Sequence, residues 1–203
     1  MDDLDKTKKE LIREPEELRL SADDLKKLMD RHRLWIEGHE GGERLDLSGK
    51  NLRGVNFRGK NLSRSDLSGS DLTDSNLEET NLTHANMYKT DLSSADMTGA
   101  EAPGVQLKQA NLDKANVDKS NLEGADLSKT QMKDATFIGT NLKNADLYKT
   151  YAVAADLSES DLSDVKAREC QMIGGDFIRA KLNGADFSRL LKKSLIQVQF
   201  CRV

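Results

Sequence analysis

The sequence predicts an all-β solenoid, a chain wound into successive coils of short extended segments, over residues 45–189. The first observation is a five-residue period that runs from Leu47 to Phe187 through 29 consecutive pentads without an insertion or a deletion. The second is the central residue of each pentad, which is Leu, Met, Phe or Val in 26 of the 29 and Ala in the others. The third is the residue two positions earlier, which is small at all 25 places from Ser65 to Ala185.

The five-residue period favours an extended segment followed by a corner. Residues two apart in an extended chain point to the same side, so the small and the central residue can both face inward. The next inward residue comes three positions later, and a bend must take up the additional residue. A helix would need apolar residues at a spacing near 3.6, which this region lacks. The residue before the centre is Asp or Asn in 21 of the 29 pentads, and these side chains favour corners because they hydrogen-bond the local backbone.

One pentad departs from the pattern in two ways. Ala102 stands where a large apolar residue is usual, and Pro103 follows it. Because Ala102 is small and proline has no backbone N–H to donate, we expect a local bulge or thinner packing at this corner. The regular pattern resumes at Leu107.

Residues 21–40 predict a helical cap for the first coil. Ser21 and Asp24 form a capping box, the usual start of a helix. Apolar or aromatic residues then follow at helical spacing, namely Leu25, Leu28, Met29, His32, Trp35 and Ile36, and Gly38 ends the run. We expect a helix over 21–37 whose apolar face covers the first coil, because solenoids need capped ends. Residues 1–20 are highly charged and contain Pro15, which predicts a loose helix or a disordered segment.

Residues 190–203 leave the five-residue register. They include Leu195, Val198 and Phe200, which are too apolar to be expected in solvent. We interpret this stretch as a tail that either caps its own chain or joins two chains.

The repeat resembles the pentapeptide-repeat family, through runs such as Ala125-Asp126-Leu127-Ser128-Lys129 and Ala145-Asp146-Leu147-Tyr148-Lys149. The resemblance implies a right-handed quadrilateral parallel β-helix with four pentads in each coil. With that number, the 29 pentads make about seven coils, and residues 20 apart lie on the same face.

The composition and the scattered polar residues favour a non-catalytic protein without metal or cofactor. The repeat itself accounts for nearly all Ser, Thr and Asp residues. His32, His39 and His84 do not stand at metal-ligand spacing, and Cys170 falls at a small inward position, which predicts a buried, inert thiol. The two cysteines, the acidic N-terminus and the absence of a membrane-length apolar run favour a cytoplasmic protein without a secretory signal. Export by a route without a cleavable signal stays open.

Outward apolar residues predict a partner-binding patch near the C-terminal end. The candidates are Ile138, Tyr148, Tyr151, Val153, Ile173, Ile178 and Phe200. With four pentads per coil, Val153 and Ile173 are neighbours on one face. Apolar surface of this kind marks interfaces. The tail could cover the patch, a second copy could pair through it as a homodimer, or another partner could bind it.

We therefore expect a protein-interaction scaffold or regulator whose partner the sequence does not identify. The alternative is a DNA mimic that binds or inhibits a type II topoisomerase such as DNA gyrase, as the fluoroquinolone-resistance members of the family do. The net charge of −4 gives no reason to expect direct nucleic-acid or membrane binding. Mimicry of DNA needs continuous rows of acidic residues. The face centred on Phe57 to Phe177 carries seven acidic and three basic residues, and the face centred on Leu47 to Phe187 carries seven basic and six acidic residues. The charges of the rod are therefore mixed.

Overall fold

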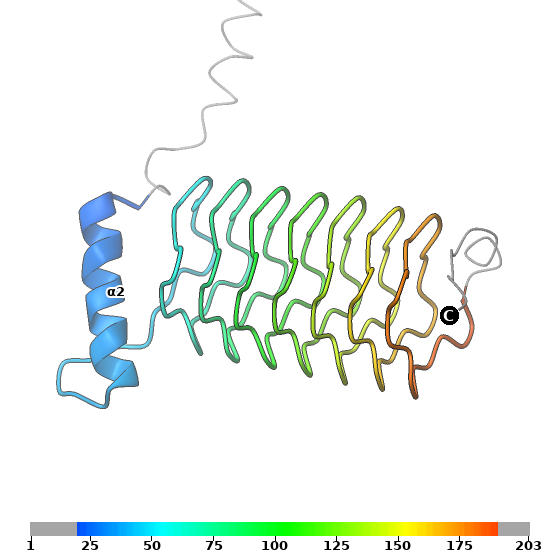
Figure 1. Ribbon diagram of the computed structural model, residues 1–203. Coiled ribbons are helices and arrows are strands. Elements are labelled where there is room, and N and C mark those ends of the chain that lie inside the picture. Colours follow the sequence, from blue (N-terminus) through cyan, green and yellow to red (C-terminus); the bar gives the residue numbers. More distant parts are fainter. Residues whose placement is uncertain (1–19, 191–203) are drawn as a thin grey trace, which may run out of the picture.

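The computed structural model describes residues 20–190 and consists of one helix followed by a long solenoid (Figure 1). The helix, α2, spans Ala22–Ile36 and stands at the N-terminal end of the stacked coils. Within the described residues the solenoid contains isolated bridges rather than longer strands. The segment predicted for 1–20 and the tail predicted for 190–203 lie outside the described residues, except for Leu20 and Leu190.

Each coil of the solenoid takes four pentads. Parallel bridges join residues 20 apart, from Asp46–Asp66 to Lys166–Asp186. In this ladder the N–H of a central residue donates to the next coil, as Leu47 does to the Asp66 carbonyl at 2.8 Å. The N–H of Asp66 in turn donates to the Leu45 carbonyl at 2.9 Å. Each inner coil is therefore bonded through its backbone to the coil before it and the coil after it.

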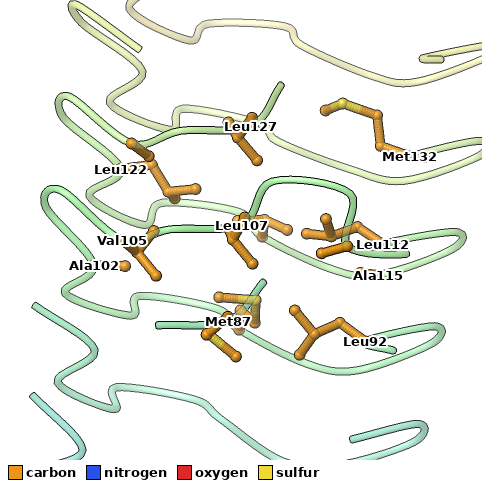
Figure 2. Close-up of a cluster of buried hydrophobic side chains, with 14 of the residues drawn as sticks. Met87, Leu92, Ala102, Val105, Leu107, Leu112, Ala115, Leu122, Leu127 and Met132 are labelled. Atoms are coloured by element: carbon orange, nitrogen blue, oxygen red, sulfur yellow. The ribbon is translucent and has the colours of Figure 1, made fainter. Parts of the chain in front are cut away.

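The core is filled by the central and the small residues, as the period predicts. Figure 2 shows columns of side chains that repeat every 20 residues, such as Met87, Leu107 and Leu127, or Leu92, Leu112 and Met132. Leu122 is 0% exposed, and Ala102 of the preceding coil is equally buried. The assignment of inward positions made from the sequence is confirmed by this burial.

Most hydroxyl groups at the small inward positions donate to backbone carbonyls, some in their own coil and some in the coil before. Thr80 Oγ1 donates to the Phe57 carbonyl at 2.8 Å, and Thr150 Oγ1 donates to the Leu127 carbonyl at the same distance. Cys170 follows Thr150 in the same column, and its thiol donates to the Leu147 carbonyl. Burial raises the pKa of Cys170 to about 12. The predicted burial of this thiol is confirmed, and the raised pKa keeps it in its unreactive form.

The corners all use left-handed backbone. The residue two after the centre has a positive φ in every pentad, where 19 non-glycine residues and 10 glycines together fill the 29 corners. An Asp or Asn side chain usually completes the corner, as Asp46 Oδ1 does by accepting the Ser48 N–H at 2.9 Å. A left-handed conformation costs a non-glycine residue roughly 1–2 kcal/mol. The bonds on both sides of the corner must therefore outweigh that strain.

The prediction of a bulge at Ala102 and Pro103 is wrong. The corner is regular, with the Val105 N–H donating to the Ala102 carbonyl at 3.2 Å and the Gly104 N–H donating to the Glu123 carbonyl at 2.8 Å. The N–H at the position of Pro103 normally bonds an Asp or Asn side chain and takes no part in the ladder. Glu101 replaces that Asp or Asn here. Proline therefore removes a donor whose usual acceptor is already missing, and its fixed φ suits the turn.

The helix begins where the capping box predicts. Ser21 Oγ accepts the Asp24 N–H at 3.1 Å and donates to the Asp24 carboxylate at 2.7 Å. Leu25, Leu28 and Met29 pack partly against the core, whereas Ile36 is 36% exposed. The helix therefore packs only loosely against the core, with the C-terminal end of its apolar stripe exposed.

His32 joins the helix to the first coil. It is 1% exposed, and its Nδ1 accepts the Leu45 N–H at 3.1 Å. Its ring stacks on Trp35 with the centroids 5.7 Å apart. Burial lowers the pKa of His32, with Arg44 acting in the same direction and the Ser63 backbone against it. The neutral ring is the form that can accept the Leu45 N–H.

The inward and outward positions predict opposite effects for two adjacent substitutions. Burial of a leucine is worth roughly 1.5–3 kcal/mol, and a carboxylate in the same place would be desolvated without a partner. Leu122→Asp should therefore lower the thermal midpoint by several degrees or unfold the middle coils. Glu123→Lys, on the outside, should leave it nearly unchanged. Equal midpoints in circular dichroism melts would contradict the assignment.

The junction at His32 predicts pH-dependent docking of α2. Undocked His32 binds a proton more readily than docked His32, because burial lowers the pKa in the folded state. Docking should thus be complete above about pH 6.5 and weaken as the pH falls from there towards the lower pKa of the docked ring. Emission from Trp35, the single tryptophan, reports the change.

The control is His32→Asn, whose side-chain oxygen can accept the Leu45 N–H and does not titrate. The exposed His39, which lies 3.5 Å from Glu37, stays intact in both proteins. The variant should show a flat emission profile between pH 7.5 and 5. A transition of the same size in both proteins would assign it to another group.

Candidate partner-binding surface

The described residues offer no arrangement typical of a metal centre. Within 20–190, no three His, Cys, Asp or Glu side chains are grouped so that they could hold a metal ion. His32 is used at the helix junction, His39 lies beside Glu37, and His84 occupies a corner. The outer surface, in contrast, carries side chains that a partner could contact.

Three of the predicted patch residues lie together on one face near the C-terminal end. Val153 and Ile173 are neighbours, because the Ala154 N–H donates to the Ile173 carbonyl at 2.8 Å. Tyr151 precedes them on the same face, bridged to Gln131 and Gln171, and its side chain is 38% exposed. We call Tyr151, Val153 and Ile173 the apolar surface.

The apolar surface coincides with a loss of the corner signature. Tyr151 and Gln171 stand where 21 pentads have Asp or Asn. Ala152 stands where a large core residue is usual, and Ala154 adopts a φ of 55° that glycine would adopt without strain. The pentad around Ala152 thus lacks both its usual corner acceptor and a full-size core residue. None of these changes improves the packing of the coil.

Tyr148 does not join the apolar surface. It lies on the neighbouring face, with Lys149 Nζ 5.1 Å from its ring centroid. Tyr148 and the Glu169 carboxylate, 3.3 Å from Lys149 Nζ, raise the pKa of Lys149. Tyr148 and Glu169 line a hollow of about 330 Å³ together with Arg168 and Arg189. Tyr148 is therefore part of a charged surface.

The remaining predicted residues lie elsewhere. Ile138 and Ile178 are half-buried on the next face, with Ser158 between them. The Ile138 N–H donates to Asp118 Oδ1 of the coil before it at 2.8 Å, since Thr136 replaces the usual Asp or Asn. Phe200 lies outside the described residues. The structure thus brings three of the seven candidates together and separates three others from them.

Acidic residues on the face centred on Phe57 to Phe177 are partly neutralised by ion pairs between coils. Arg58 lies 2.6 Å from Glu78 and 3.4 Å from Glu79. Arg179 lies 3.1 Å from Glu159 at the other end of the same face. The acidic groups of this face therefore do not form a continuous row of free charge.

A groove between α2 and the first coil was missed by the sequence analysis. It has a volume of about 470 Å³ and is lined by Leu25 and Met29 of the helix and by Asn56, Phe57 and Lys60 of the coil, among others. The apolar stripe of the helix predicts contact with the coil, but no sequence pattern gives the angle at which the helix lies. That angle decides which part of the coil stays open.

The helix in the described part of the chain is neither long nor apolar enough to cross a bilayer.

Several solved structures are similar to this chain. A pentapeptide repeat protein from Nostoc PCC 7120 is 31% identical over 50% of this chain and 78% of its own, with a TM-score of 0.42. QnrB1, a plasmid-mediated fluoroquinolone resistance protein, is 16% identical over 78% of this chain and 92% of its own, with a TM-score of 0.45. HetL, involved in heterocyst differentiation regulation in Nostoc sp. strain PCC 7120, is 24% identical over 76% and 92%, with a TM-score of 0.26.

No curated protein sequence is significantly similar to this chain. The sequence model of pentapeptide repeats, in contrast, matches in eight copies. The matched ranges are 43–74, 61–99, 90–128, 104–137, 118–151 and 153–189, which together span nearly the whole solenoid. The match is to a repeat family and indicates no enzyme class. The chain therefore belongs to the pentapeptide-repeat family.

Proposed function

We propose that this protein is a non-catalytic scaffold or regulator that binds a protein partner through the apolar surface of Tyr151, Val153 and Ile173. The observation that carries the proposal is the change of side-chain chemistry along one face. The position after the centre on this face holds, in chain order, Arg53, Thr73, Ser93, Asp113, Lys133, Val153 and Ile173. Five polar residues are thus followed by two apolar ones in adjacent coils.

The physical argument rests on comparison between equivalent positions. An outward side chain in this repeat has no role in the core, so solvent favours polar residues there. Val153 and Ile173 are neighbours, and both are apolar at this outward position. Tyr151, close to Val153, is a further exception to the preference for polar residues. Apolar groups gathered on a surface gain free energy when a partner removes them from water. The unusual residues at this site therefore support binding more than they support folding.

The proposal takes the chain as four segments: the charged residues 1–20, a capping helix within 21–40, a right-handed β-helix of about seven coils over 45–189, and the tail 190–203. The last described coil favours a role for that tail at its end. Leu182, Phe187 and Leu190 are only partly buried there, and Phe187 meets Phe177 edge-on with the centroids 6.3 Å apart. Among the candidate partners at this end, we favour a second copy of the chain. The scarcity of cysteine supports a cytoplasmic location.

The alternative function is that of a DNA mimic acting on a type II topoisomerase such as DNA gyrase. Such a mimic would need rows of free acidic charge to replace the phosphates of a duplex. The ion pairs of Arg58 and Arg179 on the acid-rich face speak against it. A gyrase supercoiling assay separates the two functions, because a mimic inhibits supercoiling whereas the proposed scaffold leaves it unchanged.

A double substitution at the apolar surface should remove partner binding without unfolding the rod. Tyr151→Ser with Ile173→Asp replaces exposed or half-buried apolar groups by polar ones outside the core. Partners captured from lysate of the native cell by the parent should be absent with this variant, while the circular dichroism stays the same. Lys143→Asp, at the equivalent position on the opposite face, should retain them. Partners captured equally by all three proteins would place the binding site elsewhere.

A homodimer through the same end has its own signature. If the surface meets itself around a two-fold axis, both copies contribute the same residues, and a stable dimer should bury at least ~1,000 Å² in total. Light scattering of the parent should then give twice the chain mass, and Ile173→Asp should give a folded monomer. A parent that is already monomeric at high concentration would exclude the dimer and leave the surface to another protein.

A further inference from the structure

We propose that the groove between α2 and the first coil binds an extended acidic peptide, which adds one strand to the open N-terminal edge of the solenoid. The helix α2 stands at the N-terminal end of the rod (Figure 1), and the groove beside it is thus far from the apolar surface near the C-terminal end. This site is therefore independent of the proposed function, and either can fail without the other.

The first coil exposes backbone groups that every later coil pairs. The Asn76 N–H donates to the Val55 carbonyl at 3.0 Å, and the Asn76 carbonyl accepts the Phe57 N–H at 2.7 Å. Asn56 holds the same place one coil earlier, yet neither its N–H nor its carbonyl bonds any residue between 20 and 190. The same holds for Asn61 within that range. Two donor and acceptor pairs thus face the end of the solenoid at the spacing of one pentad.

The helix explains why this edge stays open. Twenty positions before Asn56 is Ile36, the last residue of α2, so no earlier coil can pair with Asn56. At His32 the helix replaces the missing coil, because the imidazole accepts the Leu45 N–H. Further towards its N-terminus the helix stands away from the coil and leaves the groove of about 470 Å³. Asn56 and Asn61, which line it, are both exposed.

The walls of the groove suit one apolar side chain of an extended peptide. Leu25 and Met29 form the helical wall and are only half-buried, and Phe57 lies opposite. In strand addition, main-chain hydrogen bonds to an open edge supply affinity, and pockets for alternate side chains supply specificity. The groove offers both features, with the free groups of Asn56 and Asn61 beside an apolar wall.

The charges around the groove select an acidic peptide. Lys26, Arg33 and Lys60 line it against a single carboxylate, that of Asp30. Arg33 is 3.7 Å from Glu37, whereas neither Lys26 nor Lys60 forms an ion pair with a described carboxylate. Lys60 stands at a pentad position that is small in every pentad from Ser65 onward. A peptide with acidic residues on both sides of one leucine complements this arrangement.

The test uses the full chain and a labelled probe peptide of sequence Glu-Ala-Asp-Leu-Glu-Asp. Fluorescence anisotropy should show saturable binding. The same peptide with an N-methyl group on the leucine amide loses one backbone donor and should bind about tenfold more weakly. Hydrogen exchange at the amides of Asn56 and Asn61 should slow when the unmodified peptide is bound.

Two lysines of the first coil provide matched variants. Lys60→Glu should weaken binding about tenfold or more, because it reverses a charge beside the peptide. Lys50 holds the equivalent position two pentads earlier and does not line the groove, so Lys50→Glu should bind as the parent does. The proposal is overturned if no saturable binding occurs at about 1 mM peptide. Equal binding of the N-methyl peptide, or equal loss in both lysine variants, would overturn it as well.

Discussion

The backbone ladder between residues 20 positions apart is the interaction on which the rest of the structure depends. It holds 19 non-glycine residues in left-handed corners, each at a cost of roughly 1–2 kcal/mol. A corner such as Arg64 is retained because its N–H donates to the Thr83 carbonyl of the next coil at 2.8 Å. A single coil has no such partner. Stability is therefore shared between neighbours, and coils at the two ends differ from the others in having one neighbour less.

The fold was largely predictable because one period fixes many positions at once. Once Leu122 is assigned inward, every central residue follows, and the burial of Cys170 follows from its place two residues before a centre. The helix start was predictable for a local reason, the Ser21 and Asp24 capping box. The bulge predicted at Pro103 is absent because the N–H that proline lacks is not a ladder donor. In this corner that N–H bonds only an Asp or Asn side chain, and Glu101 had already replaced it.

The candidate surface was predictable only in part. The period gives the face on which a residue lies but not the neighbour that its side chain contacts. Val153 and Ile173 share a position in the pentad, so their contact follows from the number of pentads per coil. Tyr148 has no such constraint, and the cation of Lys149 holds its ring among charged groups. The groove beside α2 depends on the angle of a helix that is hydrogen-bonded to the first coil at His32, and the residue type alone does not predict that role.

In a quasi-one-dimensional protein, departures from the repeat are informative because each position has many equivalents in the same chain. Tyr151 can be judged against Asn51, Asp71 and Asp91 on its own face, and no difference in fold separates them. Folding therefore gives no reason for an aromatic residue there. The first coil departs in another way, since Asn56 has the usual side chain and lacks only the coil that would pair its backbone. One proposed site thus arises from altered side chains and the other from an unaltered backbone left open. The two proposals are therefore chemically distinct, since one requires a partner that covers apolar side chains and the other a partner that pairs with open backbone groups.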